Sequence, residues 1–299
     1  MSQQQSLRLG VLQMLAAMAL SGTIGWFVLQ SGQSVWNVVF VRCLLGTLGL
    51  GLYAWWRGQW RSWPFTRRSL AWCVAGGVAL VGNWLLLFNA YHFSSIGIAT
   101  MVYHTQPFWL LLLGRLVLGE ALTTRKLLAV AVAFAGMLLI VQPGAGGSGS
   151  LLGVLLALGA AVLYAVVTLI SKQLPKTLQP THIASVQTLT GVLLLWPLLD
   201  NASLWVAGAH WPYLATLGLV HTTLMYVVMY AAFRQLPTHW IGLLGFSYPV
   251  VALLVDYLAY GRLLDGWQLL GVALIIAANL WGLQRQGSGS PRPAVARQG

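Results

Sequence analysis

Acidic side chains are nearly missing from this sequence: its 299 residues contain four Asp and Glu, and charged residues of both signs make up only 7%. Soluble domains have roughly 25% charged residues, which they need to cover their surface. The shortage excludes a water-soluble enzyme, a nucleic-acid-binding protein and a disordered chain.

Cysteine is also scarce. Cys43 and Cys73 both fall inside apolar runs, so they are interpreted as small apolar side chains rather than a disulfide or a metal site. The sequence has no His-x-x-x-His or Glu-x-x-His motif. We therefore expect neither a metal ion nor another cofactor.

Hydrophobic residues make up 58% of the chain, and the mean hydropathy is +0.77. A helix needs about 20 apolar residues to cross a bilayer, and the sequence has ten runs of roughly that length. This predicts an all-α polytopic membrane protein with ten transmembrane helices. The runs cover residues 9–30, 35–56, 69–91, 96–118, 124–142, 151–171, 180–199, 211–233, 238–260 and 266–284.

The positive residues indicate the orientation of these helices. The segments before, between and after the runs lie alternately on the two sides of the membrane. Of the 16 Lys and Arg residues, 13 lie in the segments on one side, whereas those on the other side hold only Arg262. Because cytoplasmic loops carry an excess of Lys and Arg, this bias places both termini in the cytoplasm.

The two halves of the chain resemble each other. Pro107 and Gly119 recur as Pro249 and Gly261, and Leu9-Gly10-Val11-Leu12 recurs from Leu152. Each half holds five runs, and because five is odd, the second half enters the membrane from the opposite side. The predicted domains are therefore a first five-helix repeat, an inverted second repeat and a disordered cytoplasmic tail, at 1–145, 146–285 and 286–299. Such inverted repeats are characteristic of secondary transporters.

This five-plus-five plan resembles the drug/metabolite transporter superfamily, in particular its EamA-type family. The matching residues are Val41-Arg42-Cys43-Leu44-Leu45, the Pro of the fourth run, and Leu118-Gly119-Glu120-Ala121-Leu122 followed by Gly136. The second half departs from the family's pattern, with Arg262 at a position that is often acidic. The many Trp and Tyr residues look most like the aromatic and neutral amino-acid exporter branch (YddG-like). The resemblance implies export of small metabolites across a bacterial inner membrane.

The fourth and ninth runs each contain a proline beside polar or aromatic residues. Proline removes one helical hydrogen bond, which would free the carbonyls of Tyr103 and Gly245. Bare carbonyls at membrane depth are tolerated where they face protein or a wet cavity, so two broken helices predict a substrate site. The alternative is a packing kink whose hydroxyls bond back to the helix. The candidate contacts here are Tyr103, His104, Gln106, Phe246, Ser247 and Tyr248, and the candidate hinge residues are Pro107, Pro249 and Gly245.

Other polar and aromatic residues near the middle of the runs are candidates for lining the same cavity. Each of them taken singly is also a normal interhelical hydrogen-bonding or packing residue. The set consists of Trp26, Asn83, Trp84, Tyr164, Gln187, His221 and Tyr226.

Arg42 is the one clearly deep basic residue, about 10 Å into the second run at 1.5 Å per residue. Three roles stay open for it: an ion pair with Asp256 at an outer gate, a contact with a substrate carboxylate, or hydrogen bonds to backbone carbonyls that hold the fold. Glu120 lies beside Arg115, Arg125 and Lys126, where an interfacial salt bridge is expected.

The function expected from these features is an amino-acid exporter that works by alternating access at a central cavity. The alternatives are an exporter of another small metabolite or of a cationic drug, a carrier of phosphate esters, a structural role, and an intramembrane lipid-modifying enzyme. For the last of these, the sequence lacks the paired carboxylates within the runs that such chemistry commonly needs. The expected partners are amino acids and membrane lipid, with no nucleic acid, and the chain is expected to be a monomer or a weak homodimer.

Overall fold

The computed structural model describes residues 3–59, 64–94, 99, 102–141, 150–199, 204, 210–260 and 265–283. All regular secondary structure among the described residues is helical. Its helices are α1 (Gln3–Ser31), α2 (Val35–Trp56), α3 (Arg67–Phe93), α5 (Gln106–Leu118), α6 (Thr124–Val141), α7 (Leu151–Gln173), α8 (Pro180–Leu195), η1 (Trp196–Leu198), α10 (Trp211–Gly218), the π-helix η2 (Leu219–Leu224), α11 (Met225–Gln235), α12 (Thr238–Gly245), α13 (Ser247–Tyr260) and α14 (Gly266–Leu283). Arg262, the proposed repeat boundary at 145 and the tail 286–299 lie outside the described residues.

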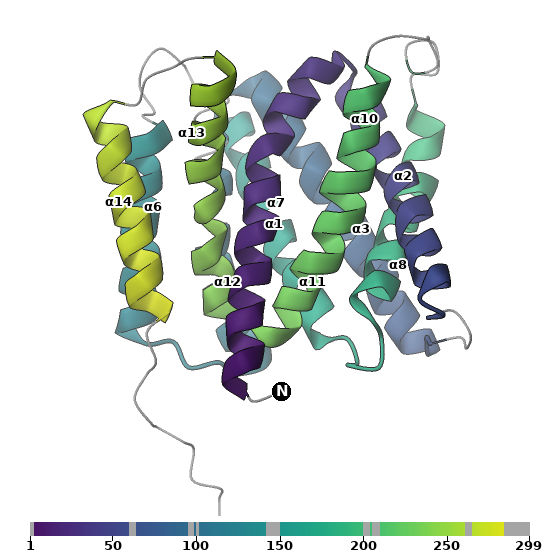
Figure 1. The fold of residues 1–299 in the computed structure, drawn as a ribbon, viewed down its shortest axis with the longest axis horizontal. Coiled ribbons are helices and arrows are strands. Elements are labelled where there is room, and N and C mark those ends of the chain that lie inside the picture. Colours follow the sequence, from purple (N-terminus) through teal and green to yellow (C-terminus); the bar gives the residue numbers. More distant parts are fainter. Residues whose placement is uncertain are drawn as a thin grey trace, which may run out of the picture.

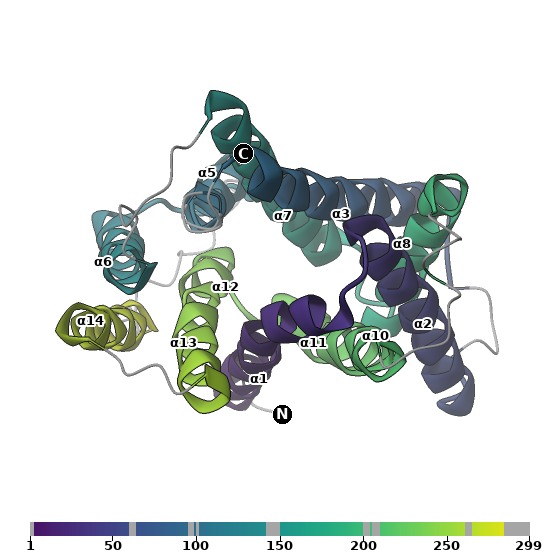
Figure 2. The same ribbon diagram turned by 90° about the horizontal axis from the view of Figure 1, so that it is seen from above.

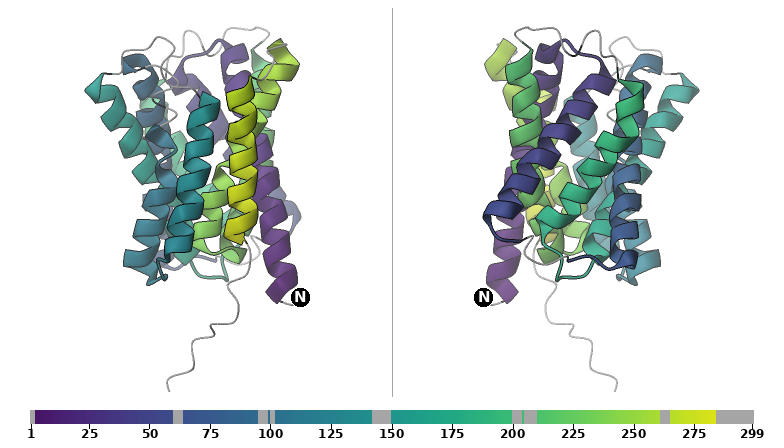
Figure 3. Two further views of the ribbon diagram at one scale, coloured as in Figure 1. Left: turned by 90° about the vertical axis from the view of Figure 1, so that its left-hand side faces the viewer. Right: turned by 90° about the vertical axis from the view of Figure 1, so that its right-hand side faces the viewer.

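The helices run side by side in one bundle (Figures 1 and 3). Within the described residues, five helices are long and apolar enough to cross a membrane. They are Gln3–Val28, Val35–Trp56, Arg67–Ala90, Leu151–Gln173 and Trp211–Gln235. Two shorter apolar helices, Gln106–Leu118 and Gly266–Gly282, accompany them. The end of the bundle at which α1 begins is called the N-terminal end below.

Short polar residues begin several of these helices. The hydroxyl of Ser34 accepts a hydrogen bond from the amide of Asn37 at the start of α2. Ser150 does the same for Gly153 at the start of α7. These hydroxyls satisfy amide groups that have no partner in the first turn of a helix. Glycine follows the C-terminal end of α5. Gly119 has a φ of +66°, which suits glycine because it has no side chain.

The two sequence halves interlock rather than form separate bodies. α3 packs along α7, α2 along α8, α1 along α11, and α6 along α14. Each of these pairs joins a helix of the first half to one of the second. A site built between such pairs receives side chains from both halves.

The pair α6 and α14 stands at one side of the bundle (Figure 2). Its backbones meet at two glycines, because a Cβ at Gly136 would lie 2.7 Å from the carbonyl oxygen of Gly271. The pair has its own hydrophobic cluster, which includes Met137, Ile275 and Leu243 of α12 and is distinct from the larger cluster of the bundle.

The predicted helix breaks are present. Residues His104 and Thr105 form a turn before α5, and Phe246 forms a turn between α12 and α13. In both places proline becomes a first-turn residue of the following helix, where its missing N–H would have no helical partner anyway. The breaks therefore lie two or three residues before Pro107 and Pro249.

Candidate functional site

Arg42 belongs to α2 and is only 2% exposed. Its guanidinium carbon is 4.7 Å from the ring centroid of Trp84 on α3, a cation–π distance. Its Nε donates to the hydroxyl of Thr222, 3.4 Å away. In the part of the chain that the structure describes, the one salt bridge joins Lys172 to Glu120. No described carboxylate therefore pairs with Arg42.

The π-helix η2 brings Thr222 to this position. The hydroxyls of Thr222 and Thr223 donate to carbonyls five residues earlier, at 2.8 and 3.2 Å. Gly46 of α2 allows the approach, since a Cβ there would lie 2.5 Å from the methyl group of Thr222. Gly46 is one helical turn beyond Arg42. A wide turn in one half and a glycine in the other thus hold the hydroxyl against the guanidinium.

Aromatic rings extend from Arg42 along α11. Tyr226 lies 6.3 Å from Trp84, and the rings of Tyr226 and Tyr230 stack at 5.4 Å between centroids. The hydroxyl of Tyr230 donates to the side-chain oxygen of Gln187, whose amide nitrogen donates to Ser171 at 3.4 Å. Both ends of Gln187 are thus occupied by protein. Arg42, Trp84, Thr222 and Tyr226 are called the Arg42 group below.

His221 links the Arg42 group to α1. Its Nε2 lies 2.6 Å from the hydroxyl of Thr23, and its Nδ1 lies 3.3 Å from the carbonyl oxygen of Thr216. The ring of Phe27 is 5.0 Å away. Trp26 packs on Phe27 at 4.9 Å. Of the predicted residues on this side, His221 is therefore near the Arg42 group, and Trp26 belongs to a neighbouring aromatic cluster.

The two helix breaks meet each other. The ring of His104 stacks on that of Tyr248 at 4.8 Å and lies 6.4 Å from Phe246. Tyr103 packs edge-on against Tyr164 at 6.2 Å. Tyr103, His104, Phe246 and Tyr248 are called the helix-break group below.

Glycines of α12 close the space around the helix breaks. A Cβ at Gly242 would lie 3.1 Å from Cβ of Pro107, and a Cβ at Gly245 would lie 3.2 Å from Nε2 of Gln106. Pro107 and Pro249 are both buried. The two prolines are therefore packed against protein in this structure.

Two buried amide oxygens near these groups have no hydrogen-bond partner within the described residues: Oδ1 of Asn83 and Oε1 of Gln106. The amide nitrogen of Asn83 donates to the carbonyl oxygen of Ala160 at 2.7 Å and to the hydroxyl of Tyr103 at 3.4 Å. An unmade hydrogen bond of a buried polar atom costs about 1–3 kcal/mol. The two oxygens are therefore candidate acceptors for a ligand.

Asn83 and Trp84 are neighbours on α3, so this helix joins the two groups: Asn83 contacts Tyr103, and Trp84 contacts Arg42. Tyr164 makes a second link, because its hydroxyl lies 3.9 Å from the sulfur of Met229 on α11. The structure thus brings most predicted residues into one connected set.

The predicted pair of Arg42 with Asp256 stays a prediction. Asp256 belongs to α13, and its side chain lies outside the described residues. α13 packs against α1, whereas α2 packs against α8 and α10. The two helices occupy different sides of the bundle (Figure 2).

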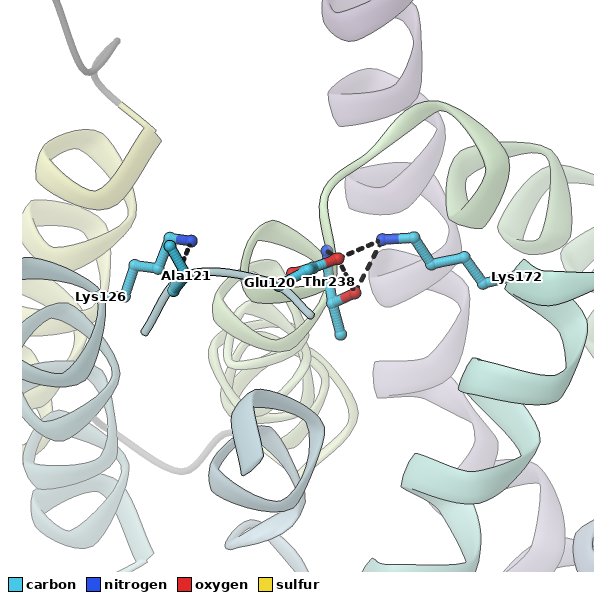
Figure 4. Close-up of polar contacts among 5 residues, drawn as sticks. All are labelled: Glu120, Ala121, Lys126, Lys172 and Thr238. Atoms are coloured by element: carbon cyan, nitrogen blue, oxygen red, sulfur yellow. Dashed lines mark hydrogen bonds and ion pairs between the residues drawn. The ribbon is translucent and has the colours of Figure 1, made fainter. Parts of the chain in front are cut away.

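A polar network joins Glu120 of the first half to Lys172 and Thr238 of the second half (Figure 4). The ammonium group of Lys172 lies 3.0 Å from Oε1 of Glu120 and donates to the hydroxyl of Thr238 at 2.7 Å. That hydroxyl donates to Glu120 at 2.5 Å. Burial raises the pKa of Glu120, but the hydrogen bonds from Thr238 and the nearby Lys172 outweigh it and hold the pKa below 4.5. The expected salt bridge of Glu120 is present, and its partner comes from the other half rather than from Arg115, Arg125 or Lys126.

Sequence reasoning missed three contributors: Thr238, Lys172 and the hydrogen-bonding hydroxyl of Thr23. Each is a short or common residue without a motif, and each matters through a neighbour more than 50 residues away. The π-helix was also missed, since nothing in its sequence, Leu219–Leu224, breaks a helical pattern.

The comparisons with known proteins agree with this architecture. The model of the EamA-like transporter family matches the chain twice, at residues 8–142 and 151–281. Because the two matches cover most of the chain, the protein belongs to the EamA-like transporter family. It is a multi-pass membrane protein of a transporter family.

Several relatives carry transporter names. The uncharacterized transporter YxxF of Bacillus subtilis is 33% identical over 273 residues, which cover 89% of this chain and 87% of that protein. A probable amino-acid metabolite efflux pump of Salmonella typhimurium is 26% identical over 210 residues, or 66% of this chain and 70% of the pump. A solved crystal structure superposes with a TM-score of 0.78 at 19% identity, covering 94% of this chain and 97% of the other. This last likeness concerns the fold alone.

Proposed function

We propose that this transporter exports amino acids, with a preference for aromatic and neutral ones, and that Arg42 binds their carboxylate. The observation that carries the proposal is a buried guanidinium that no described carboxylate neutralises. A charge buried without a counter-charge is costly, and it is retained where a ligand supplies the opposite charge. The substrate carboxylate is that counter-charge.

The remaining groups of an amino acid also find complementary partners. The unpaired oxygens of Asn83 and Gln106 are acceptors for the ammonium group. Once the helices move apart, the rings of Trp84 and Tyr226 would supply aromatic surface for an aromatic side chain. The site thereby recognises both charges of a zwitterion as well as its apolar part.

The proposed topology has ten transmembrane helices in a five-plus-five inverted repeat, with both termini in the cytoplasm. The Lys and Arg bias supports this orientation. The two matches to the family model support the repeat. With this orientation the N-terminal end of the bundle faces the cytoplasm, and the membrane is the bacterial inner membrane.

The proposed mechanism is alternating access, in which the halves rock about the site between them. The helix breaks act as hinges, with Pro107, Pro249 and Gly245 as their central residues. Their tight packing in this structure corresponds to a closed site. The Glu120–Lys172–Thr238 network joins the halves at the cytoplasmic end, so inward opening would require its contacts to separate.

Outward transport is proposed from the relatives and not from geometry. The Salmonella protein that matches two thirds of this chain is described as a probable amino-acid metabolite efflux pump. Efflux is therefore the direction to test first.

The test uses purified protein in liposomes loaded with labelled phenylalanine. Three unlabelled competitors are compared. Phenylalanine is the reference, phenethylamine lacks its carboxylate, and 3-phenylpropionate lacks its ammonium group. We expect phenylalanine to compete best and loss of the carboxylate to weaken competition roughly 100-fold, since a hydrogen bond to a charged group contributes about 1.5–3 kcal/mol.

The same assay separates the alternatives. Phenethylamine competing as well as phenylalanine would contradict the carboxylate role of Arg42 and would favour a cationic-drug exporter. No transport of any amino acid, with transport of another small metabolite, would overturn the amino-acid assignment while keeping the family.

A further inference from the structure

A cavity of about 200 Å³ lies at the N-terminal end of the bundle, away from the Arg42 group. It is enclosed by α6, α12 and α14 with the beginning of α1. No residue of α2, α3 or α11 lines it. The feature is therefore separate from the proposed substrate site.

Cations and aromatic rings form one part of the cavity wall. Arg125 and Lys126 lie in the first turn of α6, and His239 and Trp240 lie in the first turn of α12. The guanidinium of Arg125 donates to the carbonyl oxygen of Trp281 at 2.5 Å and lies 5.7 Å from the ring of that residue. Arg125 is thereby held at the cavity rather than extended into solvent.

Glu120, the acid next to this segment in sequence, bonds to residues of the second half. The ammonium group of Lys126 donates to the carbonyl oxygen of Ala121 at 2.6 Å, whereas Glu120 is engaged by Lys172 and Thr238 on the other side of the same segment (Figure 4). No Asp or Glu is among the described residues that line the cavity. The cavity therefore has a net positive wall.

The other part of the wall is apolar. Leu7, Ala129, Val130 and Leu243 line it, in continuity with the aromatic side chain of Trp240. A free phosphate would make no favourable contact with this apolar surface. A phospholipid has a negative head group for the cations and acyl chains for the apolar wall. Basic pockets between helices near a cytoplasmic surface bind such lipids.

We propose that this cavity binds one anionic phospholipid, with the phosphate at Arg125 and Lys126 and the acyl chains along Leu243 and Val130. The lipid would fill the space between the α6–α14 pair and α12. It would thus tie together two parts of the bundle whose hydrophobic clusters are separate.

The test is native mass spectrometry of the full chain, released from detergent after equilibration with equal amounts of phosphatidylglycerol and phosphatidylcholine. We expect one phosphatidylglycerol to be retained in preference to phosphatidylcholine. The Arg125→Gln/Lys126→Gln variant should lose that preference by roughly five-fold for each charge removed, or about 25-fold in all.

Arg115→Gln is the matched control, because Arg115 is an exposed cation in the last turn of α5 and does not line the cavity. It should retain the lipid as the parent does. Lys126→Gln alone provides the milder variant if the double one does not fold, which thermal unfolding checks.

Equal retention of the two lipids by the parent, or equal loss in Arg115→Gln and the cavity variants, would overturn the proposal. Displacement of phosphatidylglycerol by millimolar inorganic phosphate would assign the cavity to a free anion instead, and so would also overturn it. The lipid measurement needs no transport, so its failure is distinguishable from failure of the proposed export function.

Discussion

Arg42 and Lys172 are two cations held by helices in the same bundle, and they differ in what neutralises them. Lys172 faces Glu120 at 3.0 Å and also bonds to Thr238. Arg42 is almost fully buried, yet it has a hydroxyl and an aromatic ring as partners and no described carboxylate. A charge that is neutralised within the fold stabilises the fold. A buried cation that no described carboxylate neutralises is a candidate for binding an anionic ligand, so the comparison supports the role proposed for Arg42.

The largest expected effect follows from removing the charge at Arg42. We expect Arg42→Met to lower transport of phenylalanine roughly 100-fold, because the substrate carboxylate loses a charged hydrogen bond worth about 1.5–3 kcal/mol. The thermal midpoint should not fall, since replacing a buried charge that no described carboxylate compensates by an apolar side chain is often neutral or stabilising. Arg42→Lys keeps the charge and serves as the control, with partial transport. A strongly destabilised Arg42→Met protein would show instead that Arg42 holds the fold.

The second expected effect is at Lys172, where we expect stability rather than transport to fall. Lys172→Met leaves the half-buried Glu120 without its cation, so we expect a loss of about 1–2 kcal/mol in the free energy of unfolding, discounted for the exposure of both side chains. Transport of phenylalanine should fall far less than in Arg42→Met, because the hydrogen bonds of Lys172 go to Glu120 and Thr238 rather than to the Arg42 group. Adding Glu120→Gln should recover part of the stability, because the unpaired charge is then removed. Thermal unfolding of the three proteins in one detergent measures this.

A smaller effect is expected at the hydroxyl that bridges the ion pair. Thr238→Val keeps the side-chain shape but loses the hydrogen bonds with Lys172 and Glu120, which we expect to lower the free energy of unfolding by about 1 kcal/mol. Thr238→Ser retains the hydroxyl and should behave nearly as the parent does. Identical unfolding of Thr238→Val and the parent would show that the hydroxyl does not contribute to stability.

The smallest expected effect is a pH dependence from Glu120. Its pKa in the folded protein lies below the ordinary 4.5, so folding favours the ionised form. This contribution is present above pH 4.5 and is lost as the pH falls through the folded-state value. Between about pH 6 and about pH 3 the parent should therefore lose slightly more stability than Glu120→Gln, by less than about 1 kcal/mol. Equal losses in the two proteins would contradict the assigned direction.

The outline of the fold was predictable because it depends on composition and on local rules. Apolar runs without charges predicted helices, and Pro107 and Pro249 predicted breaks near the observed turns, since proline cannot complete the helical hydrogen bonds. The residues of the helix-break group also followed from their proximity to those prolines. Their mutual stacking, such as His104 on Tyr248, did not, because it depends on how helices from the two halves cross.

The environment of Arg42 shows where sequence reasoning ends. Three roles were open for this residue, and the structure placed a hydroxyl of the second half and a ring of α3 beside it. The approach of Thr222 requires both the π-helix and the absence of a side chain at Gly46. Neither requirement is visible in a single segment, because each depends on the other helix.

The sequence alone determined that this chain is helical and belongs in a membrane. Few charges and long apolar runs make exposure to water unfavourable, and each residue contributes to this effect independently of the tertiary structure. It also determined where two helices break, since proline acts within its own turn. Only the tertiary structure decided that Glu120 pairs with Lys172 and that Arg42 does not meet a described carboxylate. Such pairings depend on distances between segments that are far apart in the chain, and those distances arise from packing.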